Sequence, residues 1–159
     1  MQNRVTNIVI AGLGGQGVLT ASDIVADVAF AAGLQVKKSE VHGMSQRGGS
    51  VSSDVRFGPE VFSPMVAPGE ADFLVVTSTD QVPVNQAALS KNGVLIEEAQ
   101  IDATKLPTKK AINVALLGML SRHLEFPPQV WLDAIRKNFA EKLYEGNEKA
   151  FMLGRGQGA

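Results

Sequence analysis

The sequence predicts an α/β, Rossmann-like fold with a mostly parallel sheet flanked by helices. Three observations support this. The apolar run NIVIA at residues 7–11 resembles a buried strand, and the glycine-rich stretch GLGGQG at residues 12–17 follows it directly. Apolar residues then recur at helical spacing, at Ile24, Val25, Val28 and Ala32. A second strand-like segment, LQVKKSEV, follows at residues 34–41. This order forms a βαβ unit, whose strands are normally parallel with a right-handed crossover.

The middle of the chain predicts three more strands. In SVSSDVRFG, residues 50–58, Val51, Ser53, Val55 and Phe57 alternate with polar residues, which indicates a half-buried strand. The apolar runs at residues 72–76 and 94–97 indicate two buried strands. Between them we expect a helix that starts at Asp80 and extends through Leu89, because an aspartate is a good N-terminal cap.

The last third of the chain is predicted to be helical. AINVALLGMLSRHL, residues 111–124, is mostly apolar and predicts a deeply packed helix, while residues 128–143 are amphipathic. His123, near the end of the first helix, is expected to cap or pack rather than to bind a ligand. We expect one domain over residues 1–153 and a flexible tail over residues 154–159, GRGQGA.

Composition excludes several classes of function. The 159 residues include 15 Lys and Arg against 16 Asp and Glu, so no basic excess favours nucleic acid. The absence of cysteine excludes disulfides, a nucleophilic thiol and a cysteine-ligated iron–sulfur cluster on this chain. With only two histidines and no ligand spacing, no metal site is expected. No membrane-spanning run or signal-peptide pattern is visible, so we expect a cytoplasmic protein.

The glycine turn has two interpretations. Gly12, Gly14 and Gly17 fit G-x-G-x-x-G between a strand and a helix, where backbone N–H groups can bind a phosphate. The glycines could instead only allow close packing of the strand against the helix. A dinucleotide site also needs an acidic residue near the end of the second strand, where Glu40 is the available residue. Lysines flank Glu40, which favours a solvated or salt-bridged surface role.

A polar segment, HGMSQRGG, follows the second strand at residues 42–49. If the first two strands are parallel, this segment and the glycine turn meet at the carboxyl edge of the sheet, where open α/β sheets bind ligands. The alternative is a surface loop without a bound ligand. His42 and Arg47 are the candidate catalytic residues. The candidate cofactor-binding residues are Gly12, Gly14, Gly15, Gln16, Gly17, Ser45, Gln46 and Arg47.

Two segments together resemble a known family. IAGLGGQGVLTASDIVADVAFAAG and SEVHGMSQRGGSVSSDVRFG are similar to the gamma-type subunit of 2-oxoacid:ferredoxin oxidoreductases, especially the indolepyruvate type. The later strands and the C-terminal helices fit the same domain, so the resemblance covers most of the chain. It implies that the residues from Gly12 to Gly17 and from His42 to Gly49 lie at an interface or at the edge of an active site.

The resemblance also implies a function that depends on partners. Such enzymes oxidatively decarboxylate a 2-oxoacid to an acyl-CoA and CO2 and pass the electrons to ferredoxin. Thiamine diphosphate and the iron–sulfur clusters lie on other subunits or domains, which agrees with the lack of cysteine and of a thiamine-binding signature here. We therefore expect no cofactor held by this chain alone and no activity from the isolated chain. The alternative is a stand-alone dinucleotide- or CoA-binding protein.

The sequence departs from the family in one region. Family members usually carry a further stretch, including a strand, between the strand at residues 94–97 and the helix that begins near Asn113. Here residues 98–112 form a short connection. Either the chain lacks this stretch or the sequence omits a disordered part of it, so the edge strand of the sheet is not predicted, whereas the motifs are unaffected.

Overall fold

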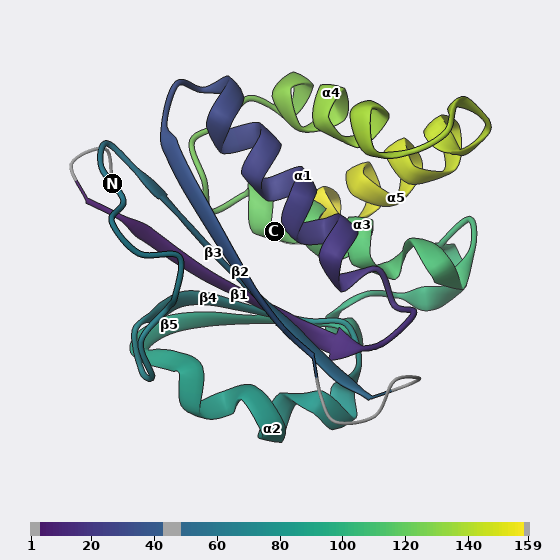
Figure 1. Ribbon diagram of the computed structural model, residues 1–159. Coiled ribbons are helices and arrows are strands. Elements are labelled where there is room, and N and C mark those ends of the chain that lie inside the picture. Colours follow the sequence, from purple (N-terminus) through teal and green to yellow (C-terminus); the bar gives the residue numbers. More distant parts are fainter. Residues whose placement is uncertain (1–3, 43–48, 158–159) are drawn as a thin grey trace.

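The computed structural model describes residues 4–42 and 49–157 of the chain. A five-stranded mixed sheet with the order β2-β3-β1-β4-β5 forms its centre (Figure 1). The strands are β1 (Thr6–Leu13), β2 (Gln35–His42), β3 (Ser50–Gly58), β4 (Ala71–Val76) and β5 (Leu89–Glu97). β4 pairs in parallel with both β1 and β5, whereas β3 is antiparallel to β1 and to β2. Four strands therefore point the same way, which confirms the α/β class.

Helices cover the two faces unequally. α1 (Val18–Ala31), α3 (Ile112–Ser121), α4 (Pro128–Asn138) and α5 (Tyr144–Gln157) lie on one side of the sheet, and the short α2 (Val82–Asn85) lies on the other (Figure 1). The main core lies under the four helices and includes Ile8, Ile10, Leu116 and Trp131, each fully buried. Short 3-10 turns fill residues 98–111, where the sequence predicted an irregular connection.

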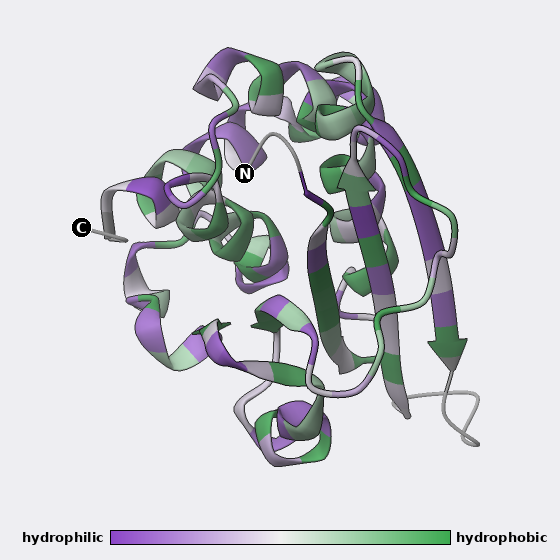
Figure 2. Cartoon of the chain, turned by 90° about the vertical axis from the view of Figure 1, so that its left-hand side faces the viewer, coloured by the Kyte–Doolittle hydropathy of each residue, from purple (hydrophilic) through white to green (hydrophobic). Residues whose placement is uncertain are grey.

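β3 carries the predicted alternation. Ser53 and Val55 are fully buried under α1 and Phe57 nearly so, at 4% exposure. On the opposite face, the connection between β3 and β4 covers the polar side chains. Asp54 accepts a hydrogen bond from the backbone N–H of Val66 at 2.9 Å, and Arg56 donates to the Ser63 carbonyl at 2.7 Å. The two faces of this strand thus pack against different layers. Figure 2 shows how apolar and polar residues alternate along the strands.

The expected βαβ unit needs one correction. β2 does point in the same direction as β1, but β3 lies between them and pairs with both. The chain leaves β2, returns antiparallel as β3, and only then continues to β4 beside β1. Sequence order did not reveal this, because strand pairing depends on long-range contacts that periodicity does not encode.

Two expected boundaries also differ. The helix predicted for residues 80–89 is a short helical stretch from Thr79 to Ala88, and β5 already begins at Leu89. Gly93 lies inside β5, where a Cβ would be 2.8 Å from the Ala71 carbonyl oxygen. The pairing of β4 with β5 shifts register between Ala71 and Phe73, so a glycine fits this close approach.

After α3 the chain forms two helices, α4 and α5. The sequence predicted one amphipathic segment over residues 128–143 and a flexible tail over residues 154–159. α4 ends at Asn138 because Phe139 adopts an extended backbone, and α5 begins at Tyr144. Residues 154–157, expected to be flexible, form the last turn of α5. Gly154 is buried there, and a Cβ on it would lie 1.7 Å from the Ala115 carbonyl oxygen. This glycine allows the backbones of α3 and α5 to approach closely.

His123 packs as expected. It follows the end of α3, and its ring lies 5.5 Å from the ring of Phe73, centroid to centroid. All helices within the described part of the chain are too short or too polar to cross a lipid bilayer.

Candidate functional site

The glycine turn and the start of β3 meet at one end of the sheet. Gly12 of β1 lies opposite Val51 of β3, and Val51 lies opposite His42 of β2. The backbone N–H of Gly14 donates to the Gly49 carbonyl at 2.9 Å. The Gly49 end of the polar segment is therefore held beside the glycine turn, and the His42 end lies two strands away at the same end of the sheet, which confirms that the two segments converge on this edge.

The centre of the polar segment, Gly43–Gly48, lies outside the described residues. It holds three predicted site residues, Ser45, Gln46 and Arg47. The backbone of His42 ends β2, but its side chain is not among the groups described. The functional roles of all these residues, and the catalytic role of His42 in particular, remain predictions.

Hydrogen bonds of Gln16 hold the glycine turn together. Its Oε1 accepts hydrogen bonds from the backbone N–H of Leu13 at 2.8 Å and from Oγ1 of Thr77 at 2.7 Å. The backbone N–H of Gln16 donates to the Leu13 carbonyl at 3.1 Å. Thr77 follows β4, so these bonds join the carboxyl ends of two parallel strands. The oxygen of Gln16 is used internally, and its Nε2 makes no hydrogen bond with the described part of the chain.

The glycines of the turn have different reasons to be glycine. A Cβ on Gly12 would lie 1.9 Å from Oγ1 of Thr77, so this position needs glycine for packing. Gly17 has a φ of 76°, and a Cβ there would lie 2.3 Å from Nδ2 of Asn113. Gly15 has a φ of 88°, but nothing lies within 4 Å of its virtual Cβ. Packing therefore explains Gly12 and Gly17, while Gly15 faces open space.

The first turn of α1 presents backbone N–H groups to this edge. Gly17 is the N-cap of the helix, and no described side chain makes a capping hydrogen bond. Asn113, 4% exposed, donates to the Gly17 carbonyl at 3.1 Å and so ties α3 to this helix start. An uncapped helix N-terminus attracts anions through its free N–H groups and its dipole. The arrangement is thus compatible with a phosphate or a carboxylate.

Sequence reasoning missed Thr77 and Asn113 as parts of the turn. Two signals pointed to them. Thr77 comes directly after the buried run DFLVV, at the carboxyl end of a strand, and Asn113 is a buried polar residue within an apolar helix. Buried polar side chains generally have hydrogen-bond partners, so their positions mark neighbouring polar structure.

Glu40 does not fit the role of the ribose-binding acid. Because β3 separates β2 from β1, Glu40 lies two strands away from the glycine turn, about 10 Å in the direction across the sheet. Its carboxylate forms an ion pair with Lys38 at 3.5 Å. Lys38 also pairs with Asp23 of α1. Burial lowers the pKa of Lys38, but the hydrogen bonds and charges of Asp23 and Glu40 together outweigh burial, so this pKa is raised overall. Glu40 is a salt-bridged surface residue, as its neighbours indicated.

The charges at this edge are distributed unevenly. The β4 and β5 side carries acidic residues: Glu98 accepts from the backbone N–H of Thr79 at 2.7 Å, and Asp80 accepts from Ser78 Oγ at 2.6 Å. Oε1 of Glu97 is buried without a hydrogen-bond partner among the described residues. The two described ends of the polar segment, His42 and Gly49, lie at the β2 and β3 side. The acidic side chains described at this edge thus lie on the β4 and β5 side.

Comparison with known proteins decides the family. The profile of the family described as pyruvate ferredoxin/flavodoxin oxidoreductase matches residues 7–157. The chain belongs to this family. Within it, the indolepyruvate oxidoreductase subunit IorB of Thermococcus kodakarensis is 35% identical, and the match covers 93% of each chain. The IorB subunit of Pyrococcus horikoshii is also 35% identical with the same coverage.

Solved structures with the same fold include other members of this enzyme class. The gamma subunit of keto/oxoacid ferredoxin oxidoreductase from Geobacter sulfurreducens has a TM-score of 0.81 at 23% identity, with 96% of this chain and 98% of that chain covered. A 2-oxoglutarate:ferredoxin oxidoreductase from Magnetococcus marinus gives a TM-score of 0.83 at 17% identity. That match covers 98% of this chain but 31% of the longer one, so the same fold there is part of a larger polypeptide.

The family relatives are longer than this chain within the matched region. The alignment with the Thermococcus IorB subunit extends over 188 positions, more than the 159 residues present here. The relative therefore has internal residues without a counterpart in this chain.

Proposed function

We propose that this chain is the subunit without thiamine diphosphate and iron–sulfur clusters in a heteromeric 2-oxoacid:ferredoxin oxidoreductase. Its substrate is an arylpyruvate such as indolepyruvate, which the complex oxidatively decarboxylates with CoA to give an acyl-CoA, CO2 and electrons for ferredoxin. The names of the IorB relatives, at 35% identity over nearly the whole chain, support the substrate class. The absence of cysteine supports clusters held elsewhere. We expect the complex in the cytoplasm.

The hydrogen bond between Gly14 and Gly49 carries the proposed role of the site. It ties the segment His42–Gly49 to the glycine turn, so this segment leaves and re-enters the sheet at its carboxyl edge. A partner subunit that docks on this edge would meet both motifs together. The chain would then complete a site whose cofactor belongs to the partner.

Each motif has a chemical task within this proposal. Arg47 binds the carboxylate of the 2-oxoacid or a phosphate of CoA, because a guanidinium can donate two parallel hydrogen bonds to such groups. His42 donates or accepts a proton at the same edge. The uncapped N-terminus of α1 and the amide N–H groups of Gln16 bind further anionic oxygens. Thiamine diphosphate, on the partner, supplies carbanion stabilisation after decarboxylation.

Co-expression with a thiamine-dependent subunit tests the proposal. We expect the two chains to co-purify and to reduce ferredoxin with indolepyruvate only when CoA is present, while this chain alone is inactive. Pyruvate and 2-oxoglutarate should give lower kcat/KM values than indolepyruvate. Failure of this chain to bind any thiamine-dependent subunit would contradict the proposal. A complex that prefers an aliphatic 2-oxoacid would contradict the substrate assignment alone.

One observation supports a second function, the binding of CoA or a dinucleotide by the chain alone. The first turn of α1 has backbone N–H groups without a described side-chain cap. A phosphate bound there would stabilise the isolated chain against heat. Titration with CoA, NAD(H) and NADP(H) distinguishes the two functions, since a melting temperature that stays constant for all three ligands rejects the stand-alone binder.

A further inference from the structure

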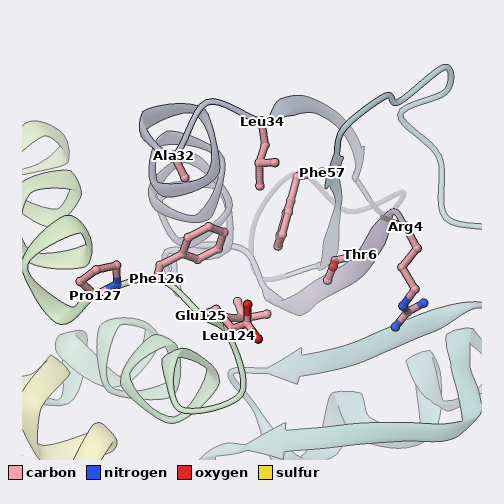
Figure 3. A pocket seen from close by; sticks show the side chains of 10 residues that line it. Arg4, Thr6, Ala32, Leu34, Phe57, Leu124, Glu125, Phe126 and Pro127 are labelled. Carbon is pink, nitrogen blue, oxygen red and sulfur yellow. The ribbon is translucent and has the colours of Figure 1, made fainter. Parts of the chain in front are cut away.

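A pocket of about 410 Å³ lies at the end of the sheet opposite the glycine turn. Thr6 and Phe57, which face each other across β1 and β3, belong to its lining (Figure 3). Thr6 and Gly12 are six residues apart on β1, so the pocket is about 20 Å from the glycine turn. The pocket is therefore separate from the site described above.

Most of the pocket lining is apolar, and Phe57 and Phe126 contribute aromatic rings. The rings of Phe57 and Phe126 are tilted and 5.6 Å apart, centroid to centroid. Ala32 and Leu34 line it from the end of α1, and the connection between α3 and α4 contributes Leu124, Glu125, Phe126 and Pro127 (Figure 3). Phe57 and Leu124 are buried, whereas Ala32 and Pro127 are exposed. The volume suits one large apolar side chain with its neighbouring atoms.

An exposed aromatic side chain lies at the same end of α1 as the pocket. Phe30, in the last turn of α1 and two residues before Ala32, is 73% exposed. A small ligand enclosed in the pocket would leave this aromatic ring in water. A protein partner would cover both, and exposed apolar surface next to a pocket is typical of an interaction site. The observations therefore favour a protein occupant over a small molecule.

The charges at the pocket specify the chemistry of the occupant. The guanidinium of Arg4 is already paired with Asp72, at 3.0 Å. Glu125 is exposed, and its carboxylate makes no hydrogen bond or ion pair with the rest of the described chain. One unpaired negative charge thus remains beside an apolar pocket. A complementary partner carries a lysine or an arginine next to the apolar side chain that enters.

We infer that this pocket is a docking site for another subunit of the complex, which inserts an aromatic or large aliphatic side chain flanked by a lysine or an arginine. The inference rests on the proposed function, because it requires the heteromeric complex. A buried apolar anchor in a pocket carries much of the binding energy of such an interface. The pocket would then hold the assembly together at the end of the sheet away from the ligand edge.

Two variants of the full chain test the inference. Ala32→Trp fills the pocket from its exposed mouth, and Glu125→Lys reverses the unpaired charge. Matched controls are Ala140→Trp and Glu141→Lys, two exposed positions outside the pocket lining. The affinity of each chain for the co-purifying thiamine-dependent subunit is measured by titration calorimetry, after thermal melts confirm that each variant is folded. We expect Ala32→Trp to raise Kd at least about 30-fold and the controls to leave it unchanged.

Hydrogen exchange supplies a readout that does not depend on substitution. We expect the backbone amides of Leu124–Phe126 to exchange more slowly in the complex than in the isolated chain. If wild type binds its partner but neither variant weakens binding, the pocket inference is overturned and the proposed function stands. If wild type binds no thiamine-dependent subunit, both are overturned. Self-association of the isolated chain that Ala32→Trp abolishes would instead assign the pocket to a second copy and overturn the inference.

Discussion

The backbone N–H of Gly14 donates to the carbonyl of Gly49 at 2.9 Å. This bond joins the glycine turn after β1 to the residue that precedes β3, and it closes the gap between two motifs more than thirty residues apart in sequence. It also means that the stability of the turn and the placement of the polar segment are coupled. Substitutions in the turn can therefore affect the function of the polar segment without touching it.

Gly12 is expected to be intolerant of any side chain. Gly12→Ala places a methyl group 1.9 Å from the position of Thr77 Oγ1, and overpacking of this kind costs about 1–3 kcal/mol. Gly15→Ala, which meets no atom within 4 Å, should cost about 1–2 kcal/mol from its positive φ alone. Urea denaturation measures both. In a double-mutant cycle, Thr77→Ala should reduce the cost of Gly12→Ala, and strict additivity would contradict the proposed clash.

Gln16 is expected to stabilise the fold as well as the site. Gln16→Ala leaves the backbone N–H of Leu13 and the hydroxyl of Thr77 without their acceptor, which should lower the free energy of unfolding by about 1–3 kcal/mol. Gln16→Glu keeps an acceptor oxygen and should retain most of the stability while removing the amide N–H groups. If Gln16→Ala were as stable as wild type, the hydrogen bonds of Oε1 would not hold the turn together.

Arg47 is expected to act in the assembled complex and not in folding. Arg47→Ala should lower kcat/KM of the complex for the 2-oxoacid or for CoA by at least about tenfold, because a lost charge-assisted hydrogen bond costs about 1.5–3 kcal/mol. Arg47→Lys should restore only part of the activity, since lysine cannot form the two-bond contact. The melting temperature of the isolated chain should not change. If Arg47→Ala unfolded the isolated chain, Arg47 would have a structural role and the prediction would be wrong.

Asp54 gives a pH-dependent test of the face opposite α1. Burial raises the pKa of this carboxyl group, and the hydrogen bond from the backbone N–H of Val66 only partly opposes the effect. A raised folded-state pKa means that ionisation of Asp54 destabilises the fold above this pKa. Asp54→Asn keeps an acceptor for Val66 and should be at least as stable as wild type at pH 7.

The difference in stability between wild type and Asp54→Asn should shrink as the pH falls below the ordinary aspartate pKa of about 4. At such a pH the wild-type carboxyl group is protonated in both the folded and the unfolded state. Thermal melts from pH 3 to pH 8 measure it. If Asp54→Asn were less stable than wild type at pH 7, and this stability difference became smaller at acidic pH, the ionised carboxylate would stabilise the fold and the prediction would be wrong.

The end of α5 is expected to be structural. Gly154→Ala forces a methyl group against the Ala115 carbonyl and should cost about 3 kcal/mol or more, because backbone at a helix contact cannot move aside easily. Gly156→Ala is the matched control, since nothing lies within 4 Å of its virtual Cβ. It should be neutral or slightly stabilising, as alanine favours helix. Equal stability of the two variants would mean that the last turn of α5 does not pack on α3.

Much of this molecule could be predicted before its structure was known. The buried strands at residues 7–11 and 72–76, the face of β3 that holds Val55 and Phe57, and the helix starting after Gly17 all follow from local periodicity and turn chemistry. The resemblance of the two motif segments led to the family, and the family match over residues 7–157 agrees with it. The boundaries near Leu89 and Asn138 were not predicted, because they depend on contacts distant in sequence: β5 pairs with β4, and the end of α4 packs against α1, where Asn138 donates a hydrogen bond to Asp27.

The sequence by itself determined the α/β class, the glycine turn between strand and helix, and the family, because these depend on residues close together in the chain. Only the tertiary structure decided that β3 lies between β1 and β2, that Gln16 bonds to Thr77, and that Glu40 is two strands from the turn. It also brought Phe57 and Phe126 together in a pocket far from the motifs. These relationships join segments distant in sequence, and they form only when the whole sheet and its covering helices bury their apolar faces together.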